Sequence, residues 1–232
     1  MSTRYNPSIA RDGLVFLVDA KNPKCFTDGV NKFNDLSGNG HNLIHQGGPT
    51  ISDGVISLDS NAFLRGNGLF MGTANQSNVS YNFTIRLNWG FNGYKTIFGF
   101  QQSSFNRVAN FVLNTGQDEL EFDLRNGGTQ NRNIFNYNMS DHKQKHALVT
   151  YTFDSGTHKL YTNGILRSTA TASLTTFPAF TGTSGGFGVG NNLASNRFLG
   201  QGNFSYMSIY LKTLTATEVL QNYNALKGRF GL

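Results

Sequence analysis

The chain has 232 residues and a formal net charge of +6, and these two properties already exclude several classes of protein. A chain of this length can bury a substantial core without disulfides, and its single cysteine, Cys25, allows no internal disulfide. No apolar run approaches the ~20 residues of a membrane-spanning helix, and the basic residues are too scattered for the clustered patch that nucleic-acid binding needs. We therefore expect a protein that binds neither membranes nor nucleic acid.

The first twelve residues form a polar lead. They include Pro7 and lack the apolar core of a signal peptide. We expect residues 1–12 to be an extended N-terminal arm that docks onto a neighbouring molecule. Synthesis and folding in a cytoplasm would agree with the lone cysteine.

Residues 13–232 alternate short strand patterns with polar, glycine-rich turns, and no long linker divides them. The apolar run at residues 13–19 predicts a strand buried on both faces, and residues 81–89 alternate as a half-buried strand does. Asn163 and Gly164 stand between two strand patterns, which favours a tight hairpin. The sequence thus predicts one all-β domain, an antiparallel jelly-roll β-sandwich.

The chain ends with a strand pattern and then a helix pattern. Alternation in residues 204–211 places Phe204 and Tyr206 on one face of the predicted strand. Thr215 and Glu218 form a capping box that starts a helix, and Gly228 can end it in a left-handed conformation. A single capped helix after so many strands predicts a lid or clasp on the sandwich.

Three separated segments together resemble laminin-G-like (concanavalin A-like) domains. The opening has DGLVFLVDA at residues 12–20 and NDLSGNG at residues 34–40. The middle has VTYTFD at residues 149–154 and KLYTNG at residues 159–164, and the end has FLG at residues 198–200 and LTATEV at residues 214–219. The resemblance spans nearly the whole chain, and it implies a fold rather than a function, because this sandwich serves lectins, hydrolases and virion proteins alike.

Two further segments resemble the versions of this domain found in tailed-bacteriophage structural proteins: NPSI at residues 6–9 and QNYNALKGRF at residues 221–230. This resemblance implies a non-enzymatic virion structural protein that decorates a capsid, tail or fibre. Its partners would be other virion proteins and cell-surface glycans, and it would form a symmetric homo-oligomer in the particle. It would be made in the host cytoplasm and reside in the virion. A free carbohydrate-binding lectin is an alternative.

A second alternative is a glycan hydrolase or depolymerase. Glu119, Glu121 and Asp123 share one face of a predicted strand, as the catalytic carboxylates of sandwich-fold glucanases do. Their spacing, Glu-x-Glu-x-Asp, departs from the glucanase pattern, and the expected aromatic flanks are missing. The other interpretation of this strand is an acidic face turned toward solvent.

The polar loops supply two further sets of candidates. Asp35, Asn39 and Asn42 offer oxygen ligands for calcium, which Asp59 or Asp154 could complete, although such residues also close turns by themselves. No other cofactor is expected. Asparagine and tyrosine side chains in exposed loops suit glycan binding, and the candidates are Asn67, Tyr94, Asn131, Asn133, Tyr137, Asn191, Asn192 and Asn196.

Overall fold

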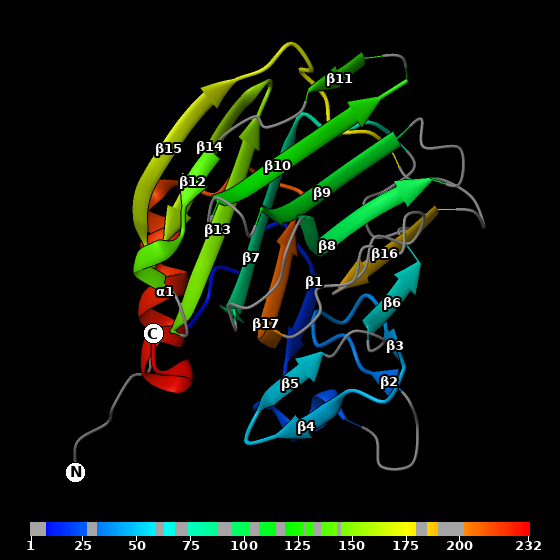
Figure 1. Cartoon of the computed structure of the whole chain (residues 1–232), viewed down its shortest axis with the longest axis vertical. Coiled ribbons are helices and arrows are strands. Elements are labelled where there is room, and N and C mark those ends of the chain that lie inside the picture. Colours follow the sequence, from blue (N-terminus) through cyan, green and yellow to red (C-terminus); the bar gives the residue numbers. More distant parts are fainter. Residues whose placement is uncertain are drawn as a thin grey trace.

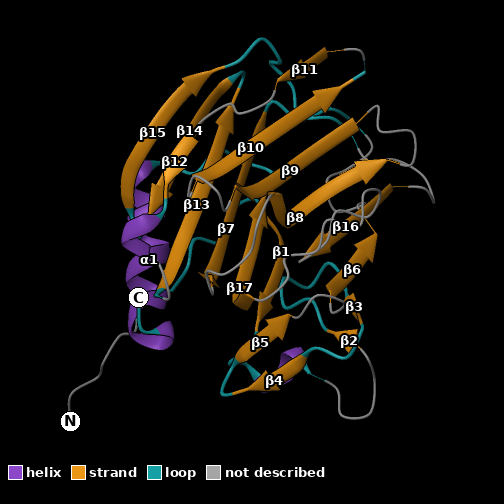
Figure 2. Ribbon diagram, in the orientation of Figure 1, coloured by secondary structure: helices purple, strands orange, loops and turns teal. Residues whose placement is uncertain are grey.

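The computed structural model describes residues 8–26, 32–58, 63–67, 74–87, 94–102, 107–114, 119–127, 129–131, 136–142, 145–179, 185–189 and 202–232. These residues form two antiparallel sheets packed face to face, with one α-helix against the outside of the sandwich (Figures 1 and 2). The predicted all-β antiparallel sandwich with a short C-terminal helix is confirmed. In this part of the chain, no helix has the length and apolar character needed to cross a membrane.

The first sheet, sheet A, has eight strands in the order β15-β14-β13-β7-β17-β5-β4, and β1 pairs with β17 beside this path. Its strands are β1 (Leu14–Asp19), β4 (Thr50–Ser52), β5 (Val55–Leu58), β7 (Asn78–Leu87), β13 (His146–Asp154), β14 (Thr157–Thr162), β15 (Ile165–Thr171) and β17 (Gly202–Tyr210). The first and last strands of the chain therefore lie side by side.

The second sheet, sheet B, has nine strands in the order β11-β10-β9-β8-β16-β6-β3-β2, and β12 pairs with β10. Its strands are β2 (Lys32–Phe33), β3 (Leu43–Gln46), β6 (Phe63–Asn67), β8 (Tyr94–Gln102), β9 (Arg107–Asn114), β10 (Glu119–Asn126), β11 (Thr129–Asn131), β12 (Asn136–Asn138) and β16 (Gly185–Val189). Two short 3-10 helices, η1 (Pro23–Cys25) and η3 (Ser140–His142), lie in the connections.

Aromatic rings fill the space between the sheets. Tyr81 of β7 stacks on Tyr151 of β13 with ring centroids 5.8 Å apart, and Phe98 of β8 stacks on Phe111 of β9 at 4.7 Å. Each of these rings is at most 1% exposed. The core is therefore built from alternate residues of the facing strands, as the predicted alternation in residues 81–89 requires.

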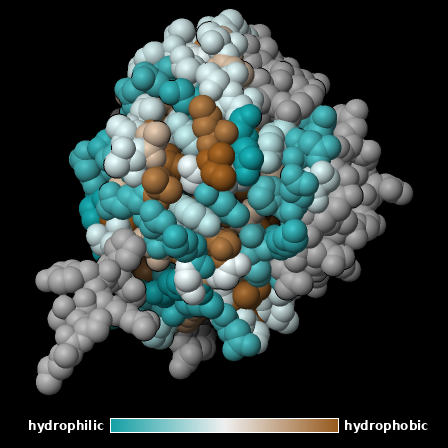
Figure 3. Space-filling model, turned by 90° about the vertical axis from the view of Figure 1, so that its left-hand side faces the viewer, coloured by the Kyte–Doolittle hydropathy of each residue, from teal (hydrophilic) through white to brown (hydrophobic). Residues whose placement is uncertain are grey.

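The helix α1 (Ala216–Phe230) lies on the outer face of sheet A. Val219 packs with Tyr210 of β17, and Leu226 and Phe230 pack with Tyr206 of the same strand. Sheet A is therefore covered on both faces along β17, and the predicted clasp is a third layer of the fold there. Figure 3 shows this side of the molecule, where separate hydrophobic groups are divided by hydrophilic surface.

Two details of the last segment differ from the prediction. Gly228 lies inside α1, and Gly231 (φ 68°) provides the left-handed C-cap. In addition, an irregularity in the pairing of β17 falls between Phe204 and Met207, so Phe204 faces the central core while Tyr206 faces α1. A β-bulge adds a residue to one strand and reverses the alternation beyond it, which simple period counting does not anticipate.

The predicted hairpin turn at Asn163 and Gly164 is confirmed. The two residues join β14 to β15 and have φ angles of 50° and 78°, the left-handed conformations that the tightest hairpins need. A second tight turn, at Ser155 and Gly156, joins β13 to β14. These two turns fix β13, β14 and β15 as neighbours at one end of sheet A.

Candidate functional site

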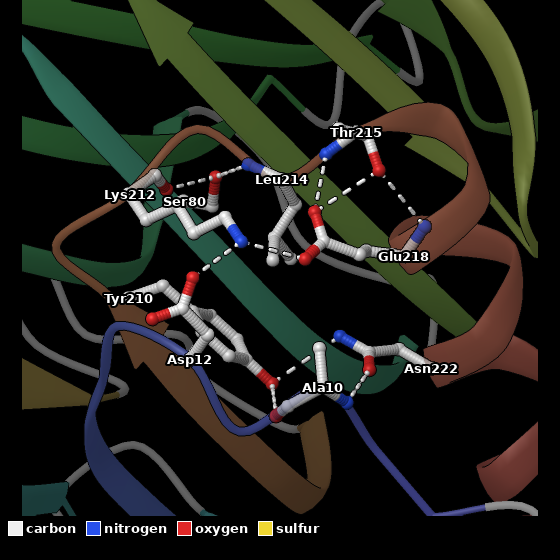
Figure 4. A network of polar contacts seen from close by, with 9 residues as sticks. All are labelled: Ala10, Asp12, Ser80, Tyr210, Lys212, Leu214, Thr215, Glu218 and Asn222. Carbon is white, nitrogen blue, oxygen red and sulfur yellow. Dashed lines mark hydrogen bonds and ion pairs between the residues drawn. The ribbon is translucent and has the colours of Figure 1, made fainter.

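The start of α1 is fixed by a network of charged and hydrogen-bonded side chains (Figure 4). The Thr215 hydroxyl accepts from the Glu218 backbone N–H at 3.2 Å, and the Glu218 carboxylate accepts from the Thr215 N–H at 2.9 Å, which is the predicted capping box. Lys212 Nζ lies 2.7 Å from both Glu218 and Asp12. The hydrogen bonds from Lys212 and Thr215 hold the pKa of the Glu218 carboxyl below its usual value.

Residues 8–12 of the predicted N-terminal arm are tied to this region of their own chain. The Ala10 N–H donates to the Asn222 side chain at 2.8 Å, and the Ala10 carbonyl accepts from the Tyr210 hydroxyl at 3.1 Å (Figure 4). Ala10 is buried between β17 and α1. Residues 1–7, the remainder of the predicted arm, lie outside the described residues.

Beside this network, a hollow of about 470 Å³ opens on the outer face of sheet A. It lies where the ends of β13 and β14 meet the connection from β17 to α1. We call it the threonine hollow, because four of its nine lining residues are threonines. The nine residues are Thr152, Asp154, Thr157, Lys159, Tyr161, Thr213, Leu214, Thr215 and Ala216. Its volume lies within the ~300–1,000 Å³ range that is usual for small-molecule sites.

Alternation along two paired strands explains this lining. Thr152 and Asp154 of β13 pair with Lys159 and Thr157 of β14, and all four project from the outer face because the residues between them enter the core. The β17–α1 connection then adds its own hydroxyls from the other side. Thr213 is fixed there, because its hydroxyl donates to the Phe153 carbonyl at 2.6 Å.

The hollow offers both kinds of hydrogen-bonding group. Asp154 is exposed, and one oxygen of its carboxylate accepts from the Asn78 side chain at 3.1 Å, while the same amide donates to the Thr213 hydroxyl at 3.0 Å. Lys159 contributes a cationic donor, and the hydroxyls of Thr152 and Thr157 can donate or accept. The hydroxyls of Thr213 and Thr215 already donate to the Phe153 carbonyl and to the Glu218 carboxylate. Tyr161 is only 4% exposed, so it contributes the edge of a packed ring rather than a free stacking surface. Such a lining suits a ligand rich in hydroxyl groups.

The acidic strand predicted from the sequence is β10. Leu120, Phe122 and Leu124 enter the core, so Glu119, Glu121 and Asp123 share the outer face of sheet B, as predicted. Glu121 is 3% exposed, while the other two are half-buried. β10 also lies inside the sheet, paired with β9 on one side and with β11 and β12 on the other. A buried Glu121 is a poor candidate for a solvated acidic face.

The predicted calcium loop is closed by its own residues. The Asp35 carboxylate accepts from the backbone N–H groups of Leu17 (2.9 Å), Ser37 (2.9 Å) and His41 (3.1 Å), and from the Ser37 hydroxyl (2.8 Å). The Asn42 side chain accepts from the Asp35 N–H at 2.9 Å, and Asn39 donates to the Val15 carbonyl at 3.1 Å. A cation at Asp35 would have to displace these donors. Among the described residues no group of three or more His, Cys, Asp or Glu side chains could hold a metal ion.

The predicted glycan-binding residues that the structure describes are divided between opposite ends of the strands of sheet B. Tyr94 lies in the same cross-strand row as Asn114 and Glu119, and Tyr137 of β12 is half-buried beside that row. Asn67 and Asn131 lie at the opposite ends of these strands. Asp59, Asn133, Asn191, Asn192 and Asn196 lie outside the described residues. The described candidates therefore do not converge on one place.

The sequence prediction missed the threonine hollow. Asp154 appeared only as an extra calcium ligand, and the threonines carried no motif. A usable signal was the i, i+2 spacing of Thr152 and Asp154 and of Thr157 and Lys159, because it places polar side chains on one face at the end of a hairpin. Its partner segment, residues 213–216, could be placed opposite only after the path of β17 was known.

A family model for the concanavalin A-like lectin/glucanases superfamily matches residues 72–220, which is well over half of the chain. The chain belongs to this superfamily. A search of curated proteins gives no match. The superfamily contains both lectins and glucanases, so membership confirms the fold and leaves the chemistry to the site.

Solved structures of botulinum neurotoxin binding domains have a similar fold. The receptor-binding domain of botulinum neurotoxin D matches with a TM-score of 0.72 and 16% identity, covering 94% of this chain and 53% of the neurotoxin domain. The serotype D ligand-binding domain in complex with N-acetylneuraminic acid gives 0.71 and 17%, covering 92% and 51%. The binding domain of neurotoxin DC in complex with rat synaptotagmin II gives 0.70 and 20%, covering 94% and 52%. This chain thus spans about half the length of those domains.

Proposed function

We propose that the chain is a non-enzymatic, glycan-binding module and that the threonine hollow is its binding site. The observation that carries this proposal is the mixed lining of the hollow, where hydroxyls, one carboxylate and one ammonium group surround about 470 Å³. A sugar hydroxyl donates one hydrogen bond and accepts others, so it needs donors and acceptors within reach of each other. Thr157, Lys159 and Asp154 supply that combination on one rigid hairpin.

The family and the fold neighbours support the same class of ligand. Lectins give the superfamily part of its name, and one neurotoxin neighbour is described in complex with a sugar acid. These neighbours are binding domains rather than hydrolases, which agrees with a non-enzymatic role. At identities of 20% or less they indicate the fold, and the choice of site depends on the geometry of this chain alone.

Binding at the threonine hollow can be tested by substitution of its carboxylate. We expect Asp154→Asn to weaken binding to the best oligosaccharide from an immobilised panel about tenfold or more, because a hydrogen bond to a charged group contributes ~1.5–3 kcal/mol. Isothermal titration calorimetry measures the change, and Thr157→Val should weaken binding as well. Asp141→Asn, which neutralises an exposed carboxylate in η3, is the matched control and should bind normally. Equal affinity for all four proteins would refute the site.

We further propose that the module is carried on a bacteriophage particle as a decoration of the capsid, tail or fibre, in symmetrically arranged copies. The support is the resemblance of residues 6–9 and 221–230 to tailed-phage structural proteins. Virion proteins occupy symmetric positions, so the copy number should be a multiple set by a ring or vertex. Quantitative mass spectrometry of purified particles measures that number. Absence of the chain from purified particles would contradict this part of the proposal.

A further inference from the structure

A second hollow, of about 340 Å³, lies on the same side of the sandwich near the other end of α1. We call it the cationic hollow. Its exposed side chains include Arg11, Lys24 and Arg229, and its buried or half-buried lining includes Leu17, Leu36 and Leu226. The N-terminal lead, the region around η1 and the last turn of α1 thus contribute one cation each.

One of the three cations is already paired. Arg229 lies 3.0 Å from the carboxylate of Asp19, the acidic residue in this lining, and Asp19 also accepts from the Lys21 N–H at 2.9 Å. Asp19 is 8% exposed, so its charge is largely turned away from solvent. This pair fixes the Arg229 guanidinium at the hollow, and its side chain stays 40% exposed.

The other two cations have no carboxylate partner within the described part of the chain. Neither Arg11 nor Lys24 forms an ion pair with any residue in the part of the chain that the structure describes. With three cations and one carboxylate, the lining carries a net positive charge that an anionic ligand would neutralise. The net charge of +6 on the whole chain adds a long-range attraction for anions.

The apolar part of the lining narrows the ligand class. Leu17 and Leu226 are at most 8% exposed and belong to the cluster that packs α1 on sheet A, and Leu36 packs against the same cluster. A free inorganic anion would leave this surface without a contact. A ligand with both a carboxylate and an apolar group, such as an acetamido methyl, would use the cations and contact Leu36, the half-buried leucine of this lining.

We propose that the cationic hollow binds the carboxylate of an acidic sugar residue. The proposal rests on the glycan-binding function proposed above and names the chemical class of the glycan. Arginine presents a planar fork of donors to a carboxylate, and lysine adds a point charge, so Arg11 and Lys24 are the residues that discriminate an acidic from a neutral sugar. Arg229 is a supporting cation, because Asp19 already engages it.

The test is a chemical-shift titration of the isotope-labelled chain with N-acetylneuraminic acid and with its uncharged methyl ester. We expect the acid to shift the backbone amides of Arg11, Lys24 and Arg229, and the ester to bind at least tenfold more weakly. Raising the salt concentration should weaken the binding of the acid, because these cations are exposed. Equal affinity for acid and ester, or shifts confined to residues elsewhere, would overturn the proposal.

Two double variants complete the experiment. Arg11→Gln with Lys24→Gln should weaken binding of the acid at least tenfold, while Arg65→Gln with Lys145→Gln changes the net charge equally at exposed positions outside this hollow and should bind normally. An equal loss of affinity in both double variants would show that only the overall charge of the chain matters, and would refute the site. A neutral methyl glycoside, followed at Asp154 and Thr213 in the same spectra, tests the threonine hollow separately. Failure of the cationic hollow to bind the acid can therefore be distinguished from failure of the threonine hollow to bind a neutral sugar.

Discussion

His158 is a titratable residue inside the aromatic core. It is fully buried, its Nδ1 lies 2.8 Å from the Tyr151 hydroxyl, and its ring lies 5.0 Å from that of Phe153. Nε2 has no hydrogen-bond partner among the residues that the structure describes. Burial lowers the pKa of His158 from 6.5 to about 4, because the charged imidazolium would lose its hydration there.

This shift predicts how stability depends on pH. Between pH 6.5 and 4 the unfolded chain takes up a proton at His158 and the folded chain does not, so the free energy of unfolding should fall as the pH falls through this window. The full effect is on the order of 3 kcal/mol, and below pH 4 the residue adds no further change. Urea denaturation from pH 7 to pH 4 measures it. His158→Gln, which retains a hydrogen-bonding side chain without titrating, should remove this component; an unchanged pH dependence in the variant would contradict the assignment.

At the scale of one element, α1 depends on its first turn. The reciprocal hydrogen bonds of Thr215 and Glu218 satisfy two backbone N–H groups that the helix cannot pair internally. The ion pair of Glu218 with Lys212 connects this cap to the end of β17 and to Asp12. The cap therefore fixes where the third layer of the fold begins.

We expect Thr215→Ala to lower the free energy of unfolding by about 1 kcal/mol, because the alanine removes the hydroxyl that caps the helix. Thr215→Ser should retain most of the stability. Thr217→Ala changes an exposed threonine in the same turn and serves as the control. Thermal unfolding followed by circular dichroism compares the three variants with the native chain. A Thr217 variant as unstable as the Thr215 variant would show that the cap is not the cause.

The elements could largely be predicted from the sequence because their signals are local. The capping box at residues 215–218 and the Asn163–Gly164 turn each depend on neighbours in the chain, and both are confirmed. Two predictions were wrong: that α1 ends at Gly228, and that Phe204 and Tyr206 share a face of β17. The choice between Gly228 and Gly231 as the C-cap and the position of the bulge in β17 both depend on packing between layers. Local pattern carries no information about that packing.

At the scale of the whole molecule, the proposed binding site could not be predicted from the sequence. The Asn78 side chain bridges Asp154 to Thr213, and Thr213 is 135 positions from Asn78 in the chain. Only the pairing of β7 with β13 and with β17 brings the three residues together. The residues chosen from loop composition instead fall at both ends of sheet B or outside the described residues. Asparagine-rich loops indicate a polar surface, whereas a binding site requires several side chains that meet in one place.

The two outer faces of the sandwich have different proposed roles. The outer face of sheet A carries α1 with a hollow near each end, and the outer face of sheet B carries Glu119, Glu121 and Asp123. If the chain were a glycan hydrolase, its substrate would lie over β9 and β10. If it binds glycans as proposed, its ligand lies beside α1.

Chemical-shift mapping with a bound neutral oligosaccharide decides most directly between these faces. We predict that the shifted amides cluster in residues 152–159 and 213–216, that Asp154→Asn reduces the shifts at the same oligosaccharide concentration, and that the oligosaccharide remains intact after prolonged incubation. Shifts centred on residues 119–123, with cleavage of the oligosaccharide, would contradict the account and assign the chain to the hydrolases of its superfamily.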